Sequence, residues 1–199
     1  SQKYLYMQGR IKQAISSSVE NYNFILSDND TKKKIQKIVE LSIKAFQSDK
    51  KILFCGNGGS AADAQHLAAE LSGRFCVDRP PLYAEALHVN SSYITAVAND
   101  FGYEETYSRM LQGCGRKGDV LLALSTSGDS SNVIRAINTA NKIGLTTIGF
   151  AGNKPTNMNT ICDIIINIPS NETARIQEAH ILIGHIICQL IEEEMFPNA

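Results

Sequence analysis

The stretch KILFCGNGGSAADAQHLAAELSGRF, residues 51–75, joins a short apolar run to a glycine-rich loop and then to an alanine-rich segment. The apolar run 51–55 shows no alternation with polar residues, which is typical of a strand buried on both faces. Glycine and serine at 56–60 predict a tight turn, and the helix that follows is expected over 60–73. A buried strand that passes through such a loop into a helix indicates a parallel α/β unit.

The same order of elements recurs along the chain. DVLLALSTSG (119–128) is the clearest strand, and it too passes through a small polar loop into a helix, 130–143. Apolar runs alternating with helices predict an α/β fold, a three-layer αβα sandwich with a parallel sheet of about five strands. Further strands are expected at 85–89, 146–152 and 163–170, helical turns and a short helix within 91–113, and helices at 8–27, 31–48 (with Thr31 as its cap) and 173–194.

Composition limits the class of protein. The net charge of −1 over 199 residues argues against a nucleic-acid partner, which usually requires a basic excess. No run of 18 apolar residues is present, so no membrane segment is expected, and the polar, basic N-terminus lacks the apolar core of a signal peptide. Five cysteines without a CxxC pair predict reduced thiols in the cytoplasm and argue against zinc held by thiolates. With no repeat or linker, one domain is expected over 1–199, with N-terminal helices at about 1–48 and an αβα core at 49–199.

Two polar loops follow two predicted strands, and ligands of open parallel sheets bind at the carboxyl ends of strands. The loops are GNGGS (56–60) and STSGDS (125–130). Small residues let the backbone approach a ligand, while hydroxyls and helix N-terminal amides bind phosphate oxygens. Neither a Walker lysine nor a GxGxxG fingerprint is present, so a monophosphate is favoured over a nucleotide. The expected donors are the hydroxyls of Ser60, Ser125, Thr126, Ser127 and Ser130.

A polar stripe follows the first loop. His66 and Glu70 are four residues apart and therefore share one face of the predicted helix, with Asp63 and Arg74 nearby. The last helix adds Gln177, His180 and His185. For His180 a place in the core or as a cap is the favoured interpretation, whereas His185 is the stronger functional candidate.

Taken together, CGNGGSAADAQHLAAELSGRF, TAVANDFGYEETYSR, LSTSGDSSNV and TARIQEAHILIGHIIC resemble the sugar-isomerase (SIS) domain, and specifically the bacterial phosphoheptose isomerases. The resemblance covers about residues 10–195. It implies a flavodoxin-like SIS fold, a cytoplasmic homotetramer with sites at subunit interfaces, and conversion of sedoheptulose 7-phosphate to D-glycero-D-manno-heptose 7-phosphate for lipopolysaccharide or related surface glycans. By the same resemblance, one Zn²⁺ per site is held by His66, Glu70, Gln177 and His185, and Glu70 and His185 are the acid–base pair. The resemblance implies substrate contacts at Asn57, Gly58, Gly59, Asn99, Asp100, Ser125, Thr126, Ser127 and Ser130. We expect Ser60, Glu70 and Gln177 to contact the substrate as well.

Residue chemistry agrees with an aldose–ketose isomerase. A carboxylate such as Glu70 can remove a carbon-bound proton, and an imidazole such as His185 can exchange protons at oxygen. Zinc could polarise the carbonyl or be structural, and the sequence leaves both open. Gln177 and His185 stand ~12 Å apart along one helix, so either neighbouring chains supply them or Gln177 lies at an irregular helix start. Two alternative functions remain: the chain is a non-catalytic SIS protein that binds a protein partner, or a regulator that senses a sugar phosphate.

Overall fold

In the computed structural model, which describes residues 1–199, five parallel strands form one sheet in the order β2-β1-β3-β4-β5. Ile52 of β1 lies between Ala84 of β2 and Val120 of β3, so the succession of strands reverses direction between β1 and β3. The carboxyl ends of the strands at such a reversal are where open parallel sheets usually bind ligands. The predicted parallel sheet of about five strands is therefore confirmed. The strands are β1 (Ile52–Cys55), β2 (Ala84–Ala86), β3 (Val120–Leu124), β4 (Thr146–Ala151) and β5 (Ile164–Asn167).

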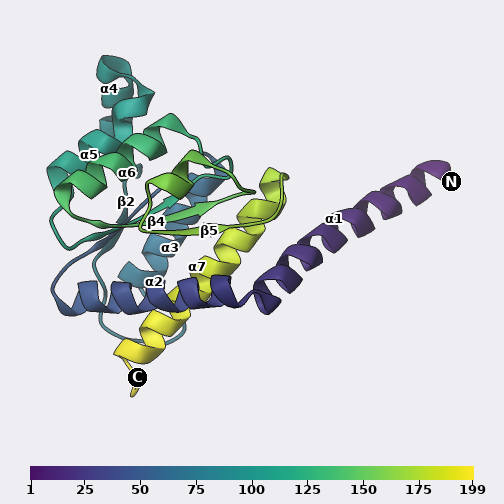
Figure 1. The fold of residues 1–199 in the computed structure, drawn as a ribbon, viewed down its shortest axis with the longest axis horizontal. Helices are drawn as coiled ribbons and strands as arrows, with labels where there is room; N and C mark the ends of the chain where they lie inside the picture. Colours follow the sequence, from purple (N-terminus) through teal and green to yellow (C-terminus); the bar gives the residue numbers. More distant parts are fainter.

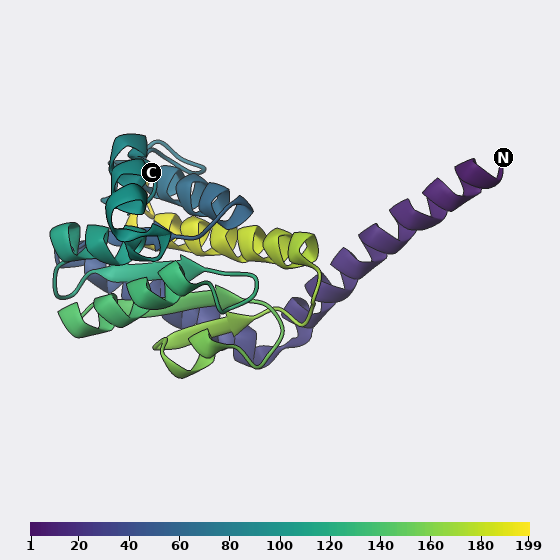
Figure 2. The same cartoon turned by 90° about the horizontal axis from the view of Figure 1, so that it is seen from above.

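Helices cover both faces of the sheet and complete the three layers (Figure 2). Ile52 and Phe54 point into a core shared with α2, α3 and α7, while Leu53 and Cys55 point into a second core shared with α5 and α6. This alternation explains why every residue of β1 is apolar. The helices that cover the sheet are α2 (Asn29–Gln47), α3 (Gly59–Ser72) and α7 (Thr173–Met195) on one face and α5 (Thr106–Cys114) and α6 (Ser131–Ile143) on the other.

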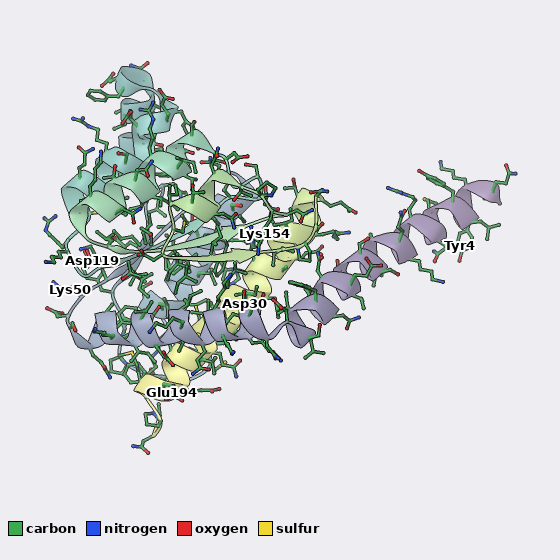
Figure 3. The ribbon with its side chains drawn as sticks, viewed as in Figure 1. Tyr4, Asp30, Lys50, Asp119, Lys154 and Glu194 are labelled. Carbon is green, nitrogen blue, oxygen red and sulfur yellow. The ribbon has the colours of Figure 1, made fainter.

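The first helix, α1 (Gln2–Ser27), leaves the body of the molecule as a long arm (Figure 1). It begins well before the predicted start at residue 8. Only its last part is anchored, where Asn21 and Ile25 are buried and Ser18 donates a hydrogen bond to Glu178 of α7. Tyr4 stands near the far end of the arm (Figure 3) and is 58% exposed. The part of α1 before Ala14, whose carbonyl accepts a hydrogen bond from Arg175, thus has no hydrogen-bond partner elsewhere in the chain.

Three details differ from the sequence-based expectations. The cap of α2 is Asp28, whose carboxylate accepts a hydrogen bond from the Thr31 amide at 3.1 Å, so Thr31 is in the first turn and is not the cap. The strands predicted at 85–89, 119–128 and 163–170 are shorter and are found at 84–86, 120–124 and 164–167. Only β3 ends where the polar residues begin, at Ser125. The remaining segments are α4 (Ser91–Phe101) and the short helices η1 (Tyr103–Glu105) and η2 (Asn157–Thr160). None of the helices is long and apolar enough to cross a membrane.

Candidate active site

The glycine loop and the serine loop lie side by side because they follow the paired strands β1 and β3. Asn57 of the first loop and Asn132 of α6 exchange two amide hydrogen bonds, of 2.8 and 2.9 Å, which join the loops directly. The hydroxyl of Tyr103 donates to the same Asn57 oxygen at 3.0 Å. Asn132 is only 2% exposed. Sequence reasoning missed it, although its place in the first turn after the serine loop is a usable signal.

Three hydroxyls converge in the serine loop. The Oγ atom of Ser125 lies 2.9 Å from that of Ser130 and 3.3 Å from that of Ser127. Gly128, with φ of +69°, makes the turn, and a Cβ there would meet the Thr156 side chain at 2.3 Å, so no larger residue fits. The loop is therefore shaped to present hydroxyls to one small group.

The helices behind the two loops both begin without a side-chain cap. At the start of α3 the cap residue is Gly58, and at the start of α6 it is Ser130, whose side chain makes no capping bond. The first N–H groups of a helix have no partner inside the helix and attract anions. The two helix starts, together with the convergent hydroxyls and the buried Ser60, form a site suited to phosphate oxygens.

A cavity of about 230 Å³ opens beside the serine loop. Its lining is almost entirely polar, which suits the hydroxyl groups of a sugar better than an apolar ligand. Two of these residues belong to the serine loop, three lie in the loops after β4 and β5, where no sequence pattern marks them, and two lie at the start of α7. The lining consists of Thr126, Ser127, Asn153, Ser170, Asn171, Thr173 and Ile176.

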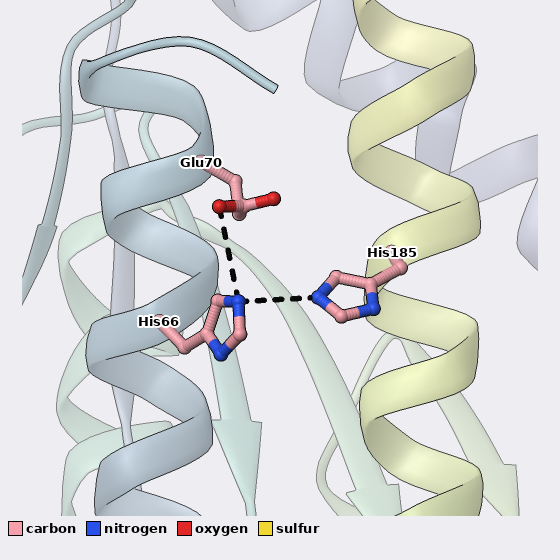
Figure 4. Close-up of side chains that lie close together, drawn as sticks. All are labelled: His66, Glu70 and His185. Atoms are coloured by element: carbon pink, nitrogen blue, oxygen red, sulfur yellow. Dashed lines mark hydrogen bonds and ion pairs between the residues drawn. The ribbon is translucent and has the colours of Figure 1, made fainter. Parts of the chain in front are cut away.

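His66 and Glu70 of α3 face His185 of the neighbouring helix α7 (Figure 4). The Nε2 atoms of His66 and His185 are 3.3 Å apart, and Glu70 Oε1 lies 3.8 Å from His66 Nε2. One donor atom from each residue lies within 4.8 Å of the others. The ring of Phe75 packs beside His185, with 5.7 Å between centroids. The four-residue spacing predicted that His66 and Glu70 share one helix face, and the packing of α7 on α3 brings His185 to them.

The geometry of this cluster fits a divalent metal. Two imidazole nitrogens bound to tetrahedral zinc at about 2.0–2.1 Å would stand roughly 3.3 Å from each other, which is the separation observed here. Two histidines and one carboxylate are a ligand set typical of catalytic zinc, with a further position left for another ligand. The Glu70 oxygen is slightly farther away and needs only a side-chain adjustment.

Gln177 lies elsewhere within the same chain. A Cβ atom on Gly59 would meet its amide nitrogen at 2.6 Å, so Gln177 packs against the first turn of α3. Farther along the same two helices Gly184 packs on Leu67, and His66 meets His185. The structure therefore brings three of the four expected metal ligands together and leaves Gln177 at the glycine loop.

His180 is fully buried and 3.0 Å from the Ala151 carbonyl oxygen. Burial lowers its pKa to about 4, so it is neutral and its Nε2–H donates to that carbonyl. The core interpretation of His180 is confirmed. Asp63, one turn before His66, has a buried oxygen without a partner, and burial raises its pKa to about 6 although His66 opposes the change.

The remaining expected residues lie at the surface. Asn99 donates to the Asp100 carboxylate at 2.9 Å, and both are exposed on α4 with no hydrogen bond to either loop. Tyr103, just beyond them, is the residue of this segment that contacts the glycine loop. Arg74 is exposed after the end of α3.

Comparison with known proteins places these features in context. Residues 20–152 match the SIS domain family. The phosphoheptose isomerase of Clostridium acetobutylicum is 46% identical over 190 residues, which cover 96% of this chain and 97% of the relative. The structure of phosphoheptose isomerase GmhA from Neisseria gonorrhoeae superposes with a TM-score of 0.88 at 36% identity, covering 94% of this chain and 99% of that one. A phosphoheptose isomerase from Francisella tularensis gives a TM-score of 0.85 at 29% identity, covering 96% and 98%.

Proposed function

This chain belongs to the SIS-domain family and, within it, to the phosphoheptose isomerases, and we propose that the two loops and the His66–Glu70–His185 cluster form its reaction centre. Its reaction is the aldose–ketose isomerisation of sedoheptulose 7-phosphate to D-glycero-D-manno-heptose 7-phosphate. The observation that carries the assignment of the centre is the convergence of two imidazoles and one carboxylate within 4.8 Å.

Isomerisation moves one proton between C1 and C2 and another between the two oxygens. Glu70 is proposed to take the carbon-bound proton, since a carboxylate held beside the substrate is a suitable general base. His185 is proposed to exchange the proton at oxygen, because imidazole gains and loses protons near neutral pH. Ser125, Ser127 and Ser130 hold the phosphate, which fixes the far end of the sugar.

One Zn²⁺ per site is proposed, with His66, Glu70 and His185 as its ligands from this chain. Bound there, the metal would polarise the carbonyl or hydroxyl of the sugar. A carboxylate or imidazole is a weaker base while it binds a metal, so the proton transfers assigned to Glu70 and His185 require these side chains in a form free of the metal. Gln177 is proposed as the fourth ligand, supplied by a neighbouring chain. Its position against Gly59 supports this proposal, because within the chain it packs on the first turn of α3, about two turns before His66.

We propose a homotetramer in which the α1 arm joins the subunits. A helix that projects from the body gains stability only if a partner covers its apolar side chains. Most of its large apolar residues are exposed: Tyr4, Leu5, Tyr6, Met7, Ile11, Ile15, Val19, Tyr22, Phe24 and Leu26.

A cytoplasmic location is proposed as well, with heptose supply to lipopolysaccharide or a related surface glycan as the role. All five cysteines are free, and Cys55 and Cys188 are buried small core residues, as expected in a reducing compartment. The sugar phosphate that the loops are shaped to bind is also an intracellular class of metabolite.

The direct test is incubation with sedoheptulose 7-phosphate while heptose phosphate formation is followed. Glu70→Gln keeps the shape and removes the base, so kcat is expected to fall by about 10²-fold or more. Glu193→Gln is the matched control, since Glu193 is exposed on α7 and contacts only Gln189. Near-normal turnover of Glu70→Gln would remove Glu70 from the mechanism, and an inactive wild-type protein would contradict the assignment of the reaction.

A further inference from the structure

Arg79 and Glu192 form a buried ion pair that joins the end of α3 to α7. The Nε of Arg79 donates to Glu192 Oε2 at 2.9 Å, and the two side chains are 0% and 3% exposed. A fully desolvated pair of this kind is stable only when further hydrogen bonds satisfy both partners. Here every such bond goes to the backbone of residues 70–80, beside the proposed reaction centre.

The guanidinium of Arg79 donates hydrogen bonds to the backbone carbonyls at the end of α3. Its Nη2 donates to the Glu70 carbonyl at 2.7 Å, and its Nη1 donates to the carbonyls of Leu71 and Gly73 at 2.8 and 2.9 Å. The last carbonyls of a helix lack partners inside it, and a cation there also complements the helix dipole. The backbone of Glu70 is thus held by a buried charge.

The carboxylate of Glu192 holds the segment that follows. It accepts the amides of Phe75, Cys76 and Val77 at 3.0, 2.7 and 3.0 Å. Phe75, fixed in this way, presents its ring to His185. Glu192 is seven residues beyond His185 on α7, so both side chains leave the same face of that helix, two turns apart.

We propose that Arg79 and Glu192 are positioning residues that set the separation of the His66–Glu70–His185 ligand atoms. His66 and Glu70 belong to α3 and His185 to α7, so this separation depends on how the two helices lie against each other. The ion pair fixes the end of one helix against the face of the other. Arginine suits this place because its planar fork bonds the carboxylate and four carbonyls at once, whereas a lysine ammonium has only three donors around one atom. The inference rests on the proposed metal site.

The first test uses the unmodified protein. If the ion pair and the cluster are coupled, Zn²⁺ binding must stabilise the ion pair by the same factor by which the pair favours Zn²⁺. Hydrogen exchange at the amides of Phe75, Cys76 and Val77 is expected to slow about 10-fold or more when Zn²⁺ saturates the protein. The amides of Lys51 and Arg116, which donate to the other buried ion pair, Lys51–Asp119, serve as the internal control and are expected to keep their rates. Equal changes at both sets, or none at residues 75–77 with Zn²⁺ bound, would overturn the proposal.

The second test compares Arg79→Lys and Glu192→Gln with Asp119→Asn, which weakens a buried pair at the opposite end of the strands. Zn²⁺ affinity, measured by chelator competition, is expected to fall about 10–100-fold in the first two variants only. Their kcat is expected to fall while KM for the sugar phosphate changes little, because the phosphate loops are untouched. If all three variants lose Zn²⁺ affinity and kcat in proportion to thermal stability, the pair is merely structural.

Two outcomes separate this inference from the proposed metal site. If Glu192→Gln does not fold, Arg79→Lys and the exchange rates of the wild-type protein decide the matter. If the wild-type protein binds no Zn²⁺, the proposed metal site is wrong. The kinetics of Arg79→Lys then test only whether the ion pair positions Glu70 and His185, and a lower kcat with little change in KM is expected. The same changes of kcat and KM in Asp119→Asn would refute this positioning role.

Discussion

The Nε2 atoms of His66 and His185 lie 3.3 Å apart although 119 residues separate them in the chain. One comes from the helix after the first strand and the other from the last helix of the fold. Their approach is a product of tertiary packing, because α3 and α7 run side by side on one face of the sheet (Figures 2 and 4).

Zn²⁺ is expected to bind with a stoichiometry of one per chain and to require this pair. His66→Ala removes one of the three ligand atoms that each chain supplies to the proposed cluster, so binding measured by calorimetry on metal-free protein should weaken by at least about 10²-fold. His88→Ala is the matched control, because the structure pairs His88 with Gln65 outside the cluster. Equal binding by His66→Ala and the wild-type protein would exclude the proposed site.

Substrate affinity is expected to depend on the serine loop. Ser127→Ala and Ser130→Ala each remove a hydroxyl from the convergent group, and the loss of about 1–3 kcal/mol corresponds to roughly 5–150-fold in KM. Ser131→Ala serves as the control, since this neighbouring hydroxyl is exposed and bonds none of the three. Unchanged kinetics in both loop variants would show that phosphate binds elsewhere.

Mixed subunits test the proposed origin of Gln177. Gln177→Ala and His185→Ala proteins are each expected to be inactive. If the two side chains come from different chains, some sites in a mixture contain both and regain activity. The control is exchange of labelled subunits, measured separately. Exchange without recovered activity would mean that one chain supplies both residues.

Acid stability is expected to reflect His180. Its folded pKa of about 4 lies below the unfolded value of 6.5, so the unfolded chain takes up a proton first as the pH falls. This residue therefore contributes roughly 3 kcal/mol of stability that is present above pH 6.5 and lost progressively toward pH 4. His180→Gln removes the titration, so its unfolding free energy should fall less steeply over that interval in urea titrations. Parallel curves for the two proteins would contradict this account.

Much of the fold could be predicted from local pattern. The uninterrupted apolar run 51–55 and the alternation of such runs with helices predicted the parallel sheet, because burial on both faces leaves no place for polar residues. His66 and Glu70 could be paired because four residues make one helical turn. The glycine and serine loops could be placed together because both follow parallel strands.

Other features depend on contacts between distant segments. Asn132 bonds Asn57 from the helix after a different strand, and only its place just after the serine loop marks it in the sequence. Glu192 bonds Arg79 from a distant part of the chain, and no local pattern pairs the two. Thr31 was expected to cap α2, but Asp28 does so because α1 and α2 are separated by that single residue. Helix propensity alone also did not predict the early start of α1.

The helices α3 and α6 both begin without a hydrogen bond from a capping side chain, so the folded protein lacks the stability that such caps contribute. No side chain bonds their first N–H groups, so we expect the phosphate of the sugar to accept the hydrogen bonds that capping side chains accept in most helices. On this proposal, a phosphorylated ligand completes the hydrogen bonding of the two helix starts. By linkage, sugar phosphate and inorganic phosphate alike should raise the melting temperature, and free phosphate should compete with the sugar for the same amides.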